Sequence, residues 1–143
     1  MKPAFRSFGI SLLLHLASGS AQSSELYKLS DLSARQQAQL FEQVDAYGLL
    51  TAFLNSCKRP PHMAERLSPI AKGCVEDNSF QLIVKRFNDA VLQNSGSYKC
   101  DSPGFTERVA AFEAKIEAVV DSFAMACRVH SFAGASFPNA RAP

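Results

Sequence analysis

Apolar residues recur every three or four positions along most of the chain, which is the spacing of one face of an α-helix. Four such stretches are predicted, at residues 33–56, 62–73, 79–93 and 103–128. The clearest stripe lies in the last stretch and consists of Phe105, Val109, Phe112, Ile116, Val119, Phe123 and Cys127. Because no segment alternates apolar and polar residues over the length of a strand, the sequence predicts an all-α fold.

A proline-rich break separates the first two predicted helices. Ser30 or Ser33 can cap the first helix by accepting a hydrogen bond from an unpaired backbone N–H. Pro60 and Pro61 end it, since proline has no N–H to donate and restricts the residue before it. Gly48 lies inside the first helix, where the absence of a side chain allows another helix to approach closely.

The remaining helices carry their own start and stop signals. Pro69 is expected to kink or split the second helix, and Gly73 is expected to terminate it. The cap candidates for the third and fourth helices are Asp77, Asn78, Ser79 and Ser102, with Pro103 at the first position of the fourth helix.

The first 21 residues have the pattern of a secretory signal peptide. Lys2 and Arg6 precede a short apolar run at residues 10–17, and small residues follow up to Ala21. The run is roughly half of the ~20 residues that a transmembrane helix needs. We therefore expect this segment to be removed, leaving a secreted or periplasmic protein without a stable membrane anchor.

The rest of the chain is expected to form one domain with two flexible ends. Residues 22–32 lack a sustained period and are predicted to be a lead-in segment. Residues 33–130 are predicted to be the helical domain, a size that suits a single core. Residues 131–143 contain small residues and proline without periodicity, and are predicted to be a flexible tail.

Four cysteines, at positions 57, 74, 100 and 127, predict two disulfides in an exported protein. In an antiparallel bundle the connections alternate between the two ends, which brings Cys57 near Cys100 and Cys74 near Cys127. A Cys57–Cys74 bond would have to span a helix of about 12 residues, roughly 18 Å, against a Cα limit of about 7 Å. The nested pairing, Cys57–Cys127 with Cys74–Cys100, is the alternative. The sequence thus predicts an antiparallel four-helix bundle stapled by two disulfides.

Charge argues against a nucleic-acid partner. The formal net charge of +2 comes from the signal peptide, which contains Lys2 and Arg6 and no acidic residue. The remainder of the chain is formally neutral, whereas nucleic-acid binding depends on neutralising phosphates with Lys and Arg. We expect no nucleic acid and no anionic membrane surface among the partners.

No catalytic set of residues stands out. His62 and His130 are the histidines that remain after the signal peptide, and no common catalytic or nucleotide-binding motif is present. Cys57 with His62 and Cys127 with His130 could form a zinc set, but this would leave the other two cysteines to pair alone. Neither a metal nor a cofactor is expected.

Glu113, Glu117 and Asp121 share one strip of the last helix. Paired carboxylates can perform acid–base chemistry or bind metals. This strip lies away from the apolar stripe of the same helix, so we expect it to face solvent. The protein is therefore predicted to be non-enzymatic, with a hydrolytic or metal-dependent enzyme as a less favoured class.

Two binding functions are compatible with this chain. The leading prediction is that it binds another macromolecule, a protein, through a rigid basic loop and an aromatic tail; the candidate residues are Lys58, Arg59, His62, Phe132 and Phe137. The alternative is a carrier of an apolar small ligand in a Phe-lined helical cavity. This alternative is motivated by eleven phenylalanines, most of which lie after the signal peptide at helical spacing.

Overall fold

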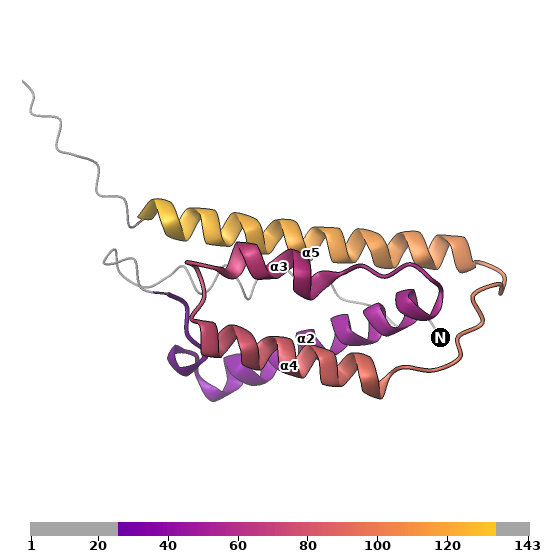
Figure 1. Cartoon of the computed structure of the whole chain (residues 1–143), viewed down its shortest axis with the longest axis horizontal. Helices are drawn as coiled ribbons and strands as arrows, with labels where there is room; N and C mark the ends of the chain where they lie inside the picture. The colour runs from indigo at the N-terminus through magenta and orange to yellow at the C-terminus, as the bar shows by residue number, and fades with distance from the viewer. Residues whose placement is uncertain (1–25, 134–143) are drawn as a thin grey trace, which may run out of the picture.

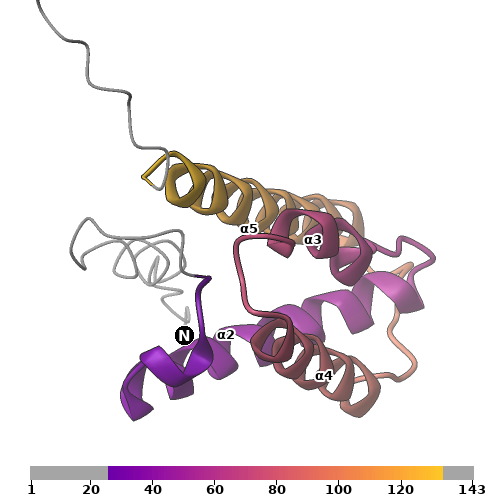
Figure 2. The same ribbon diagram turned by 60° about the vertical axis from the view of Figure 1, so that its left-hand side comes forward.

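Residues 26–133 fold into four α-helices arranged as two packed pairs. The structure is a computed structural model that describes residues 26–133. Its elements are η1 (Leu29–Asp31), α2 (Ala34–Ser56), α3 (Met63–Ala71), α4 (Asp77–Gln93) and α5 (Phe105–Ala133). Helix α2 lies beside α4, and α3 lies beside α5 (Figure 1; Figure 2). The predicted all-α, four-helix architecture is confirmed.

The sequence signals at the ends of α2 and α3 act largely as predicted. Ser33 caps α2 in a capping box, in which Ser33 Oγ accepts from Gln36 N at 3.3 Å and Gln36 Oε1 accepts from Ser33 N at 2.9 Å. Gly73 follows α3 with a φ of 81°, the left-handed conformation that favours glycine after a helix end. Pro69 does not split α3, because it lies in the last turn and the helix ends two residues later.

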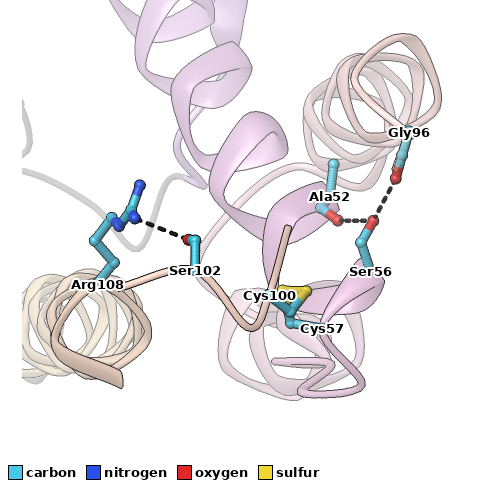
Figure 3. Close-up of a disulfide and its surroundings, with 7 residues drawn as sticks. All are labelled: Ala52, Ser56, Cys57, Gly96, Cys100, Ser102 and Arg108. Atoms are coloured by element: carbon cyan, nitrogen blue, oxygen red, sulfur yellow. Dashed lines mark hydrogen bonds between the residues drawn. A yellow bond between two sulfur atoms is a disulfide. The ribbon is translucent and has the colours of Figure 1, made fainter. Parts of the chain in front are cut away.

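The predicted caps of α4 and α5 are wrong. Glu76 is the N-cap residue of α4, and no side chain caps it. Helix α5 begins at Phe105 rather than at Pro103, directly after Gly104, whose φ is 76°. Ser102 Oγ accepts instead from Arg108 Nη2 at 3.1 Å (Figure 3). At its other end α5 continues to Ala133, past the predicted end and into the predicted tail.

Two disulfides join the helices at separate places, in the pairing that the bundle geometry predicts. Cys57–Cys100 has a Cα–Cα distance of 5.6 Å, and Cys74–Cys127 has one of 5.4 Å. No cysteine within residues 26–133 is free. Both alternatives, the nested pairing and the zinc set, are therefore wrong.

The Cys57–Cys100 bond ties the end of α2 to the long connection between α4 and α5 (Figure 3). A bifurcated hydrogen bond reinforces this junction, since Ser56 Oγ donates to the carbonyl of Ala52 at 2.9 Å and to that of Gly96 at 3.0 Å. The Cys57 end of the molecule is consequently held both covalently and by polar contacts.

The buried side chains form two separate clusters. The first consists of Leu54, Met63, Val109 and Ile116, with Phe53, Phe105 and Phe112 among the aromatic rings packed around it. Phe53 meets Phe112 edge to face with a centroid distance of 5.1 Å. The second consists of Ala71, Cys74, Val75 and Cys127, with Tyr27, Phe80 and Phe123 packed against it.

None of the helices within residues 26–133 combines the length and the apolar character that crossing a lipid bilayer requires. The two disulfides are compatible with an oxidising compartment, where such bonds persist. The predicted signal peptide at residues 1–21 lies outside the described residues.

Candidate functional site: an apolar pocket between the two core clusters

A pocket of about 170 Å³ lies between the two core clusters. Tyr47 and Phe87, which pack against the first cluster, line it together with Phe80, which packs against the second. The pocket is therefore bordered by both clusters. All four helices contribute to the walls.

Helices α2 and α4 line the pocket with their predicted apolar stripes. Leu40, Val44 and Tyr47 come from the first half of α2, whereas Thr51 and Leu54, further along the same face, are buried. The α4 contribution consists of Phe80, Ile83, Val84 and Phe87. The same helix faces thus fill the core at the Cys57 end and leave a space toward the Cys74 end.

The second pair of helices completes the walls. Met63, Ala64 and Leu67 line the pocket from α3, and Val119 and Phe123 line it from α5. Leu67 and Val119 also pack against the first core cluster. Fixed, packed side chains therefore form these walls, as is usual for a preformed ligand site.

The segment before α2 adds a further wall, which sequence reasoning missed. Tyr27, Lys28, Leu29 and Leu32 line the pocket, although this segment was expected to be a lead-in without structure of its own. A signal was present in the sequence, because Leu26, Leu29 and Leu32 are spaced three residues apart.

Backbone hydrogen bonds attach this segment to the connection between α3 and α4. Tyr27 N donates to the Cys74 carbonyl at 2.9 Å, and Glu76 N donates to the Tyr27 carbonyl at 2.9 Å. These bonds form an isolated parallel bridge between Tyr27 and Val75. The Cys74–Cys127 disulfide holds the same connection against α5, so one wall of the pocket depends on that bond.

Side chains of α2 and α4 hold the rest of the segment. Leu29 N donates to Ser79 Oγ at 3.0 Å, and Ser79 Oγ donates to Glu76 Oε2 at 2.8 Å. Gln37 Nε2 donates to the carbonyls of Leu29 at 2.8 Å and Leu32 at 3.1 Å. Because Ser79 is only 4% exposed, this polar contact is shielded from water and fixes the segment over the pocket.

The pocket is almost free of charge. Lys28 is the only charged residue among the described residues that line it. Burial raises the pKa of Tyr27 and of Tyr47, so both phenols stay protonated and neutral at physiological pH. An apolar space of this kind is chemically suited to a hydrocarbon or an aromatic ring.

The predicted partner-binding residues lie elsewhere. Lys58, Arg59 and His62 are exposed on the connection between α2 and α3, and none of them lines the pocket. Arg59 is engaged with α5, since its Nε donates to Glu113 Oε1 at 2.9 Å. Phe132 belongs to α5, but its side chain is outside the described part of the structure. Phe137 lies entirely outside the described residues.

In the carboxylate strip of α5, Glu117 and Asp121 are solvent-exposed, as predicted, whereas Glu113 is half-buried. Two members of the strip are paired. Glu113 binds Arg59, and Glu117 forms a bidentate pair with Arg66, whose Nη1 and Nη2 donate at 2.7 and 2.6 Å. This hydrogen bonding lowers the pKa of Glu117. The strip therefore joins α5 to α3 and the loop before it.

No group of three or more His, Cys, Asp or Glu side chains in residues 26–133 is placed to hold a metal ion. Among the features of the described chain, the apolar pocket is therefore the candidate ligand site. Comparison with protein-family models, with curated protein sequences and with solved structures finds no match for this chain.

Proposed function

We propose that this protein is an exported carrier of a small apolar molecule, which it holds in the pocket between the two core clusters. The observation that carries the proposal is the pocket itself, a space of about 170 Å³ with walls from all four helices and, among the described lining residues, one that is charged. Export is proposed from the signal-peptide pattern of residues 1–21, and the two disulfides are compatible with it.

The energetics of packing favour a filled pocket. Protein interiors are close-packed, and voids larger than a water molecule are few. The pocket is partly open and its walls are mostly apolar, so in the absence of a ligand these walls face water. A ligand that occupied the pocket would be stabilised by roughly 25 cal/mol for each Å² of apolar surface that it removed from water.

The volume limits the size of the ligand. A closed apolar cavity of about 150 Å³ accepts benzene, whereas sites for drug-sized molecules measure about 300–1,000 Å³. The pocket, at about 170 Å³, therefore suits a single aromatic ring or a medium-length alkyl chain. A larger ligand would have to leave part of its structure outside.

Calorimetric titration of octan-1-ol into the purified, disulfide-bonded protein tests the carrier function. We expect saturable binding to the wild type and loss of binding in Val84→Trp, because an indole at this lining position fills the space. Leu92→Trp is the matched control on the same helix, since Leu92 is 72% exposed and does not line the pocket. Absence of binding to the wild type, or equal binding to Val84→Trp, would contradict the proposal.

A second candidate function is recognition of a macromolecular partner, a protein, by the loop between α2 and α3. The observation that favours it is the fixed backbone of this exposed loop. Lys58 N donates to the Asn55 carbonyl at 3.0 Å, Arg59 N donates to the Leu54 carbonyl at 2.8 Å, and Cys57 is in a disulfide. A preorganised loop loses less conformational entropy on binding than a mobile one.

Pull-down experiments test this second function. A Lys58→Ser/His62→Ser variant should lose a partner that the wild type captures, because both side chains are exposed. A chain truncated after Ala133 tests the contribution of the tail that contains Phe137. If the loop variant captured the partner as well as the wild type does, the proposal that this loop binds the partner would be contradicted.

A further inference from the structure

We infer that the ligand of the apolar pocket is an amphiphilic acid, with its hydrocarbon part between the helices and a carboxylate beside Lys28. This inference rests on the proposed carrier function and names the chemical class of the ligand. Lys28 is the only charged residue among the described lining residues. Lys28 is exposed, and a lysine stem can lie along an apolar wall while its ammonium group stays in water.

No other polar lining side chain within residues 26–133 brings a negative charge to the pocket. The Ser79 hydroxyl proton is already donated within the protein, and Gln43 has an interaction partner. Tyr27 and Tyr47 are neutral phenols, because burial raises the pKa of both. Gln36 accepts a backbone N–H through Oε1, and its Nε2 amide group can donate to an acceptor-only carboxylate. The lining therefore does not repel a carboxylate and offers it an amide donor.

The charge balance of the pocket points in the same direction. Within residues 26–133 Lys28 forms no ion pair, whereas Arg59, Arg66, Lys85 and Arg86 each do. No acidic residue is among the described lining residues. The negative charge of a carboxylate would pair with this ammonium group, whereas a neutral hydrocarbon would gain nothing from it.

Parallel titrations of octanoate and octan-1-ol separate the head group from the alkyl chain. We expect Lys28→Met, which keeps an apolar stem, to weaken octanoate binding about two- to fivefold and to leave octan-1-ol binding unchanged, as expected for an exposed charge pair. Lys28→Glu should weaken octanoate binding further. Raising the salt concentration should shrink the difference between wild type and Lys28→Met, because exposed charges are screened.

Lys99→Met is the matched control, since it removes the same charge from an exposed residue that does not line the pocket. It should leave both affinities unchanged. Equal effects of Lys28→Met on octanoate and octan-1-ol, or no effect on either, would overturn the acidic-ligand inference while the carrier function stands. Failure of the wild type to bind either compound would overturn the carrier function itself.

Discussion

Gly48 of α2 and Ala90 of α4 lie so close together that a Cβ atom built on Gly48 would be 2.5 Å from the Ala90 Cβ. The Phe87 carbonyl oxygen and the Val91 nitrogen would lie 3.1 and 3.2 Å from the same atom. This close approach belongs to the α2–α4 pair, and it lies one residue beyond Tyr47, which lines the pocket. The predicted role of Gly48 as a site of close helix approach is confirmed.

Gly48→Ala should lower the free energy of unfolding by about 1–2 kcal/mol. Overpacking typically costs about 1–3 kcal/mol, and the better helix propensity of alanine returns up to about 1 kcal/mol. Urea denaturation followed by circular dichroism measures the change. Gly96→Ala is the control, because nothing lies within 4 Å of a Cβ at that position. A Gly48→Ala variant more stable than the wild type would contradict the close approach of α2 and α4 at this position.

Removing either disulfide should destabilise the protein by a similar amount but affect the pocket differently. The two bonds close loops with sequence separations of 43 and 53, and chain entropy assigns about 4 kcal/mol to each. Cys74→Ala/Cys127→Ala should also lose octan-1-ol binding, because the Cys74 carbonyl accepts from Tyr27 N in the pocket wall. Cys57→Ala/Cys100→Ala should retain binding under conditions where it is folded. Equal loss of binding in both variants would contradict the conclusion that the Cys74–Cys127 bond supports the pocket wall around Tyr27.

Acid should weaken the fold through two arginine–carboxylate pairs. A hydrogen bond from Arg86 lowers the pKa of Asp45, and one from Arg66 lowers the pKa of Glu117. Because the pKa of each carboxyl is lower in the folded state, its stabilising contribution is present above the ordinary pKa of about 4. That contribution is lost as the pH falls through the lowered, folded-state value.

The urea midpoint should therefore decrease as the pH is lowered from about 5 to 2. Asp45→Asn/Glu117→Gln should show a shallower decrease over this range, with a small effect because both pairs are exposed and screened. Asp101→Asn, on an exposed loop, serves as the control and should keep the wild-type slope. If the double variant and the wild type had the same slope, these two pairs would be excluded as the source of the loss of stability in acid.

The helices could be predicted because each buries one apolar stripe at helical spacing. The starts and ends of α2, α3 and α4 lie within two residues of the predicted positions. The disulfide pairing followed from the same stripes, since alternating helix directions place Cys57 and Cys100 at one end. The end of α5 was harder to predict, because the residues from Val129 to Ala133 carry no turn signal that separates them from the helix.

The pocket could be foreseen only as an alternative, because its existence depends on contacts between distant segments. The α4 stripe of Phe80, Phe87 and their neighbours is the same whether it meets a filled core or a space. The deciding contact, Tyr27 with Cys74 and Glu76, joins the segment before α2 to the connection between α3 and α4, and no pattern within either segment indicates this pairing. The pairing of Arg66 with Glu117 was likewise hidden, since a wheel of α5 alone places Glu117 in solvent.

Intermolecular nuclear Overhauser effects between octan-1-ol and methyl-labelled protein give the most direct test of the pocket as a ligand site. The carrier account predicts contacts from the alkyl protons to the methyl groups of Leu67, Val84 and Val119, which line the pocket from three helices. Contacts confined to Leu82 and Leu92, whose side chains are exposed on α4, would contradict it.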